Sequence, residues 1–226
     1  MIRVVTVAAL AASIGAASVA RAQSTEPLVP GNRDASAQLA RIVDATRDAG
    51  LPVDPILAQV NYGVRMVHAE PARIVASARA IAARLKIARD ALAPASPNDI
   101  IAGADALRSG ATDDALRAVR GASGGRPVAT PLGVLAQLIE TKVPVDRATE
   151  IVTNLMRRGV TADQLVALGN NVNDDVRGVS DDSKRGAAAL AALDARARFL
   201  SGVLAPAARG AAVTAFSPSG QPPKKP

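Results

Sequence analysis

The most informative absences in this 226-residue sequence are those of reactive and metal-binding side chains. The sequence contains no cysteine and a single histidine, His68. Disulfides, cysteine nucleophiles and metal sites built from several histidines are therefore excluded. Tryptophan is also absent, and the aromatic residues are Tyr62, Phe199 and Phe216. Single-stranded nucleic acids are bound largely by stacking on aromatic side chains, so we expect no nucleic-acid partner.

A run of small and apolar residues follows Arg3 and extends from Val4 to Ala20. The Ala-Arg-Ala triplet before Gln23 fits the small-x-small cleavage rule, which predicts a signal peptide over residues 1–22. The alternative is an uncleaved membrane anchor, but the run is near the lower length limit for a span and contains threonine, serine and glycine. We expect a periplasmic or secreted protein after cleavage before Gln23, and the sequence does not distinguish these two locations.

The rest of the chain carries helical periodicity and no convincing strand alternation. We expect a flexible leader over residues 23–32, a helical domain over 33–205 and a disordered, proline-rich tail over 206–226. Residues 33–120 and 130–205 are candidate sub-units of the helical domain. The predicted fold class is all-α, with short antiparallel helix hairpins packed as an irregular bundle or a degenerate α-solenoid.

Several helix starts carry capping residues. Ser96 is followed three positions later by Asp99, and Thr161 is followed three positions later by Gln164, which is the spacing of a capping box. Thr112 precedes two aspartates and is a simple N-cap candidate. These signals divide the chain into short helices separated by turns.

The motif apolar-Pro-Val-Asp occurs twice, in "LPVDP" (Leu51–Pro55) and "VPVDR" (Val143–Arg147). Both copies are interpreted as helix starts, with Asp54 as an N-cap whose side chain accepts backbone N–H groups. If the two copies begin equivalent units, residues 51–92 and 143–176 form superposable helix pairs. Chance similarity among alanine-rich helices is the alternative explanation.

The stretch "GLPVDPILAQV…EPARIVASARAIAARL", within residues 50–92, resembles a pattern of uncharacterised exported all-α bacterial proteins. That pattern is Gly-Leu-Pro-x-acid-Pro-Leu, followed by a second helix rich in alanine and arginine. The resemblance implies an exported protein built from helix hairpins. It implies no activity, cofactor or site residue.

Catalytic and metal-binding chemistry finds little support. His68 falls at a turn between two predicted helices, and no Gly-x-Ser-x-Gly motif provides a nucleophile for it. The segment Asn170–Asp182 has acidic and amide oxygens at calcium-loop spacing, but Val176 replaces the required glycine and Asp182 the bidentate glutamate. Adjacent carboxylates on a helix point about 100° apart and need not share a cleft; these pairs are Asp113/Asp114, Asp174/Asp175 and Asp181/Asp182. We expect no enzymatic activity, no cofactor and no metal, and a carboxylate hydrolase is the weakest alternative.

One predicted helix, over residues 71–92, is strongly basic and offers candidate contacts to an anionic surface. These are Arg73, Arg79, Arg84, Lys86 and Arg89. The alternative interpretation, without a binding function, is that they are solvated side chains whose aliphatic stems pack over alanine.

The leading functional hypothesis is an exported, non-enzymatic helical-repeat protein that acts as a protein-interaction or scaffold module. Its expected partner is another envelope or secreted protein. The alternative is binding of anionic lipid or polysaccharide at the envelope surface through the basic helix. The sequence leaves the oligomeric state open.

Overall fold

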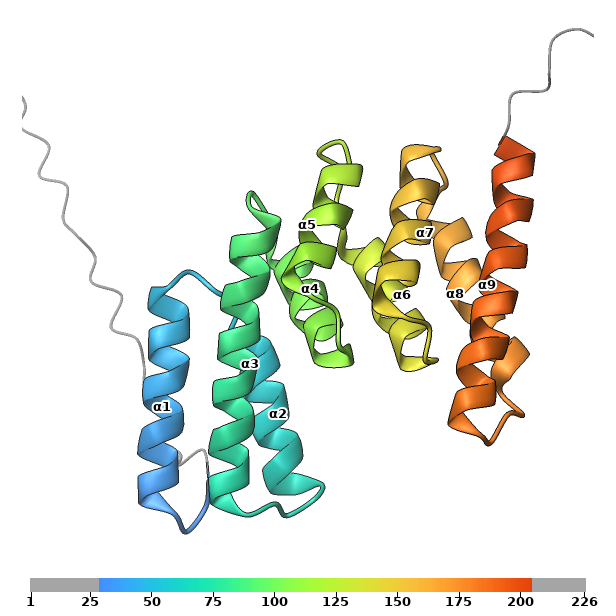
Figure 1. Ribbon diagram of the computed structural model, residues 1–226. Coiled ribbons are helices and arrows are strands. Elements are labelled where there is room, and N and C mark those ends of the chain that lie inside the picture. The colour runs from blue at the N-terminus through green and yellow to red at the C-terminus, as the bar shows by residue number, and fades with distance from the viewer. Residues whose placement is uncertain (1–28, 205–226) are drawn as a thin grey trace, which may run out of the picture.

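The computed structural model describes residues 29–204, which form nine α-helices and no strand, with 77% of these residues in helix (Figure 1). The all-α fold class predicted from the sequence is confirmed. The predicted signal peptide, the proline-rich tail and the first part of the leader lie outside the described residues. The helices are α1 (Arg33–Asp48), α2 (Asp54–Arg65), α3 (Pro71–Leu92), α4 (Pro97–Ser109), α5 (Asp113–Ala122), α6 (Ala129–Glu140), α7 (Val145–Arg157), α8 (Ala162–Val176) and α9 (Asp182–Leu204).

The helices follow one another in chain order from one end of the molecule to the other (Figure 1). Helices α1, α3, α5, α7 and α9 form one row, in which each packs against the next odd-numbered helix. Helices α4, α6 and α8 form a second row, joined to the first mainly through the α3–α4 and α8–α9 contacts. Helix α2 packs against α3 and makes no extensive contact with α4, so the second row is interrupted between α2 and α4.

A single buried cluster of aliphatic side chains extends from α1 to α9. The candidate sub-units 33–120 and 130–205 share this cluster, because α4 of the first packs closely against α6 of the second. Leucine, valine and alanine make up most of the interior, as expected for a chain with few aromatics. The largest fully buried side chains are Leu39, Ile56, Leu85, Leu92, Leu116, Leu132, Leu135, Leu138, Leu155, Leu165, Leu168 and Leu193.

The end of the predicted leader is fixed on α1. Val29 is buried, its N–H donates to the Ser36 hydroxyl at 3.1 Å, and that hydroxyl donates back to the Val29 carbonyl at 3.1 Å. The Asn32 side chain then caps α1 by accepting the N–H of Ala35 at 2.9 Å. Residues 29–32 therefore belong to the helical domain.

The capping boxes predicted at Ser96 and Thr161 are both present, and the Thr112 side chain caps α5. The prediction for Asp54 is wrong. Helix α2 has Val53 at its N-cap position without a side-chain hydrogen bond, and Asp54 is the first helical residue. In that position the carboxylate contributes only through its charge near the positive end of the helix.

The two Pro-Val-Asp segments both begin helices, but they do not begin equivalent hairpins. Helix α2 packs against α3, whereas α7 packs against α5 and α6, and α8 packs against α6 and α9. Within the first pair, Ile56 and Val60 are buried on the inward side of α2, and Leu57 is only half-buried. Internal repetition of the sequence stays a prediction.

Glycine allows α3 and α4 to cross closely. A Cβ atom added to Gly103 would lie 2.8 Å from Leu92 Cδ1 and 3.0 Å from Ala88 Cβ. Leu92 and Ala88 are fully buried, so neither has free space to move into. Gly133, in the interior of α6, has no such neighbour, because a Cβ added there would meet nothing within 4 Å.

Alanine substitutions at these two glycines should therefore have opposite effects. Gly133→Ala removes the helix penalty of glycine and should raise the free energy of unfolding by about 1 kcal/mol. Gly103→Ala gains the same propensity but overpacks the α3–α4 crossing, which typically costs about 1–3 kcal/mol. Urea denaturation of both variants measures the difference, which we expect to be about 2 kcal/mol. An unfolding free energy for Gly103→Ala equal to or above that of Gly133→Ala would contradict the close crossing.

Candidate functional site

Asp99 is the only charged residue that is buried among residues 29–204, with 3% of its surface exposed. Its Oδ1 accepts the backbone N–H groups of Val128 and Ala129, both at 2.8 Å, at the start of α6. Its Oδ2 accepts the Ser96 hydroxyl at 2.9 Å and the Ser96 N–H at 3.3 Å. Four hydrogen bonds occupy the carboxylate, so Asp99 connects two helix starts and has no oxygen left for a substrate.

The hydrogen bonds also set the protonation of Asp99. Burial alone would raise the pKa of its carboxyl, but the hydrogen bonds from Val128, Ser96 and Ala129 outweigh burial and leave the pKa below its ordinary value. The group is therefore a charged structural cap at neutral pH. A general acid would need the opposite shift.

The paired aspartates do not form acid–base pairs. Arg117 binds both Asp113 and Asp114, at 2.8 and 2.7 Å. Asp174 pairs with Arg177, just after the end of α8, and Asp175 pairs with Arg196 of α9. In the third pair, Asp182 lies 3.7 Å from Arg185, and Asp181 accepts the Lys184 N–H at 3.0 Å.

The candidate calcium segment is largely helix. Helix α8 continues to Val176, which is buried together with Val172, and Asp175 uses both of its oxygens on Arg196. No group of three or more potential metal-ligating side chains occurs among the residues that the structure describes.

The basic helix α3 presents its cations on two different sides. Arg79 donates to Gln38 of α1 at 2.7 Å, and Arg89 donates to the Ala49 carbonyl at 3.1 Å. Lys86 and Arg89 both bind Asp90, whose pKa their hydrogen bonds hold below its ordinary value. Three of the five predicted contacts are thus engaged within the protein.

Arg73 and Arg84 lie on the other side of α3. They are eleven positions apart in the sequence, so they point within about 20° of one another around the helix axis. Arg79, Lys86 and Arg89 point between about 160° and 240° away from Arg73. The sequence named all five cations, but only Arg73 and Arg84 share an open side of the helix.

A cavity of about 680 Å³ lies in the interruption between α2 and α4, and we name it the α2–α4 cleft. Tyr62 of α2, Ile81 and Arg84 of α3, and Ile101 and Arg108 of α4 are among its lining residues. Tyr62 is 52% exposed, so much of its ring is accessible from the cleft. The cleft therefore combines apolar side chains with Arg84, Arg108 and one acid, Asp105, which lies 3.8 Å from Arg108.

A second cavity, of about 570 Å³, adjoins the α2–α4 cleft at the turn between α2 and α3. Gln59 and Ser77 line both cavities. The two cavities are therefore neighbours along the same side of α3. Arg73 and His68 line the second cavity. His68 has a backbone φ of +46°, and the sequence predicted its place at a turn but not its position beside a cavity.

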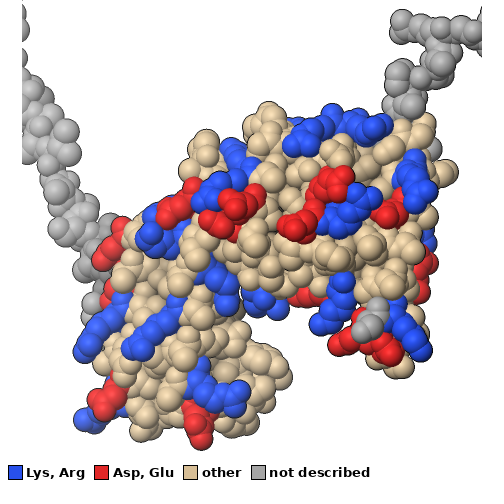
Figure 2. All heavy atoms as spheres, in the orientation of Figure 1, with Lys and Arg blue, Asp and Glu red and all other residues tan. Residues whose placement is uncertain are grey.

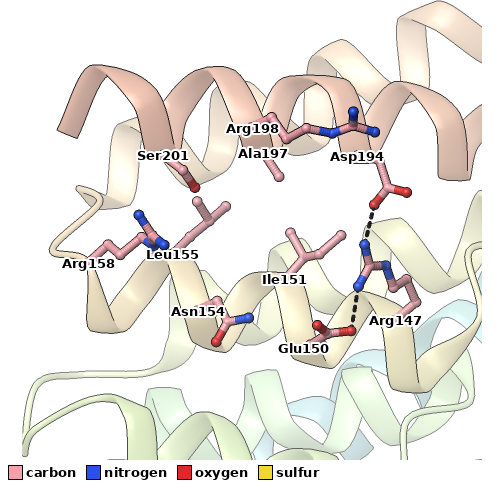
Figure 3. A pocket seen from close by; sticks show the side chains of 10 residues that line it. All are labelled: Arg147, Glu150, Ile151, Asn154, Leu155, Arg158, Asp194, Ala197, Arg198 and Ser201. Carbon is pink, nitrogen blue, oxygen red and sulfur yellow. Dashed lines mark hydrogen bonds and ion pairs between the residues drawn. The ribbon is translucent and has the colours of Figure 1, made fainter. Parts of the chain in front are cut away.

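A third cavity, of about 430 Å³, lies between α7 and α9 (Figure 3). Its apolar floor is formed by Ile151 and Leu155, and Figure 3 shows Arg147 reaching across to Asp194. Arg147 also binds Glu150. Its hydrogen bonds raise the pKa of the guanidinium, and the bond to Glu150 has a larger effect than the bond to Asp194. The ion pair between Arg147 and Asp194 ties α9 to α7.

None of the helices within residues 29–204 is long and apolar enough to cross a membrane. No known family model matches the sequence, and neither a curated protein nor a solved structure matches the chain. The resemblance to exported helical bacterial proteins stays a prediction, and the functional argument rests on the geometry of the clefts.

The Asp99 interaction predicts a specific dependence of stability on pH. Asp99→Asn removes the charge but keeps the shape, and it should lower the free energy of unfolding at pH 7 by about 1.5–3 kcal/mol, the value of hydrogen bonds to a charged group. Because the folded-state pKa is lowered, the stabilisation is fully present above the unfolded pKa of about 3.9 and is lost as pH falls through the folded value. Chemical denaturation of both proteins from pH 7 to pH 3 should show the gap narrowing below about pH 4.

The matched control for this measurement is Asp114→Asn, because Asp114 forms an exposed ion pair with Arg117 on α5. This variant should remain close to wild type across the same pH range. A gap between wild type and Asp99→Asn that stays constant down to pH 3 would contradict the charged-cap assignment.

Proposed function

We propose that this protein is a non-enzymatic interaction module that binds another protein in the α2–α4 cleft. The observation that carries the proposal is the interruption of the second helix row between α2 and α4, which leaves an apolar-lined cavity of about 680 Å³. Elsewhere in that row, α4 packs against α6 and α6 against α8. The signal-peptide pattern of residues 1–22 makes an envelope or secreted protein the partner that we propose.

The apolar surface beside the cleft supports this proposal. Tyr62, Met66 and Val67 stand close together at the end of α2 and are 52%, 70% and 51% exposed. Exposed apolar side chains that cluster beside a cavity are typical of binding surfaces, whereas singly scattered ones are not. Tyrosine, methionine and arginine are also enriched in protein–protein interfaces.

The alternative, an anionic envelope surface bound by the basic helix, has weaker support. Arg79, Lys86 and Arg89 already have partners within the protein. On the face shown in Figure 2, basic and acidic side chains lie interspersed and make no field of one sign. An anionic lipid surface attracts clusters of uncompensated cations. Cations that line a cleft are accessible to a ligand that enters the cleft, and less so to a broad membrane surface.

Photo-crosslinking tests the proposed binding surface. A photoreactive phenylalanine analogue at position 62 should give a discrete crosslinked product in extract of the native cell envelope. Wild-type protein in excess should compete for this product. Tyr62→Ala should need about tenfold more protein to compete, because a buried interface tyrosine commonly contributes that much affinity. The tyrosine side chain is half exposed in the free protein, so its truncation should leave the fold unchanged.

Val166 provides the matched control, since it is an apolar residue of α8 with 41% exposure and lies outside all three cavities described above. The photoreactive residue at position 166 should give no comparable product, and Val166→Ala should compete like wild type. Equal crosslinking from both positions would contradict a binding surface at the cleft. Co-sedimentation with anionic lipid vesicles that disappears in moderate salt would favour the alternative instead.

A further inference from the structure

We infer that the ligand of the α2–α4 cleft is an amphipathic helical segment of the partner, with two carboxylates about three turns apart on the edge of its apolar stripe. The inference rests on the proposed function and adds the chemistry of the recognised segment. Its basis is the pair Arg73 and Arg84, which line the two adjoining cavities on one side of α3.

The two arginines are available for an external anion. No carboxylate of the described residues lies within 4 Å of either guanidinium. Arg108, the third arginine of these cavities, is different: it lies 3.3 Å from Glu140 and 3.8 Å from Asp105. Arg73 and Arg84 are therefore the arginines of this surface that have no carboxylate partner.

The spacing of the two arginines sets the length of the ligand. Eleven helical positions correspond to about 16 Å along the axis of α3. A ligand helix that lies along α3 presents two residues at the same separation if they too are eleven positions apart. Guanidinium groups bind carboxylates through two parallel hydrogen bonds, which favours glutamate or aspartate over a neutral side chain.

The surface between the two arginines is mostly apolar or small. Ile74, Ser77 and Ile81 line the cavities along α3, and Ala58 and Tyr62 line them along α2. An apolar helix face laid in a groove between helices is a recurring mode of recognition, read through anchors at positions three and four apart. The acid Glu70 also lines the cavity at the α2–α3 turn, beyond Arg73, and would repel a longer acidic segment.

A synthetic helical peptide tests this inference directly. The probe is a capped peptide of about sixteen residues, with a leucine stripe at helical spacing and two glutamates eleven positions apart at the edge of the stripe. Isothermal titration should show binding to the wild-type protein that weakens as salt increases. Replacing both glutamates with glutamine should weaken binding by at least about tenfold. A further peptide with the glutamates on the opposite side of the helix should bind no better than the glutamine peptide.

Charge reversal on the protein provides the discriminating measurement. Arg73→Glu and Arg84→Glu should each weaken binding of the glutamate peptide by about tenfold. A peptide with two lysines in place of the glutamates should bind the double variant better than it binds wild type, which a merely structural role could not produce. Arg41→Glu is the control: it makes the same charge change on an exposed residue of α1, outside both cavities, and should bind like wild type.

The outcomes separate the inference from the proposed function. Equal affinity for the glutamate and glutamine peptides, absence of rescue by charge reversal, or no binding by any peptide up to about 1 mM would overturn the inference. If Tyr62→Ala still reduced competition for the crosslinked envelope protein, the proposed function would stand without it. If Tyr62→Ala also had no effect, both would fail.

Discussion

The buried carboxylate of Asp99 is the interaction on which the arrangement of the helices depends. It closes the capping box of α4 through Ser96 and caps the start of α6, which has no capping side chain of its own. One group thus fixes two helices that begin 32 positions apart, at Pro97 and Ala129. A charge this deeply buried is costly without partners, and its four hydrogen bonds make it stabilising only in this geometry. The anchor thereby joins α4 and α6, which pack closely against each other.

The same principle explains why the cleft lies between α2 and α4. Helix α2 has no side-chain cap at Val53, and Asp54 does not reach a neighbouring helix. Its main fixed point is a close crossing with α3, where Gly63 lies against Ile74: a Cβ added there would be 3.1 Å from Ile74 Cγ1. Helix α2 is therefore held against the odd-numbered row but not against α4. The interruption in the second row is a consequence of where the anchors are.

The sequence predicted features that depend on residues three or four positions apart and missed those that depend on distant ones. The caps at Ser96, Thr112 and Thr161 were predictable because donor and acceptor belong to the same turn. The second role of Asp99 was not, since its partners at α6 lie about thirty residues away and carry no special side chain. The predicted α7–α8 pair is wrong for a related reason. Helix α7 packs against α5 and α6, and helix α8 packs against α6 and α9.

Part of the candidate site is contained in the sequence. A rotation of about 100° per helical residue separates Arg73 and Arg84 from the other three cations of the basic helix. What the sequence could not show is which side of α3 remains open, because that depends on the absence of α4 beside α2. The sequence places the charges on a helix, and tertiary packing selects the pair that can meet a ligand.

The distribution of paired and unpaired polar groups is consistent with the proposed binding role. Every buried side-chain nitrogen and oxygen within the described residues has a hydrogen-bond partner. The carboxylates that would serve a hydrolase are largely taken up by arginines, often on the same helix. Tyr62, which is 52% exposed, and the cations Arg73 and Arg84, which have no carboxylate partner, lie around two adjoining cavities. The ligand that we propose would supply this surface with an apolar cover and with counter-charges together.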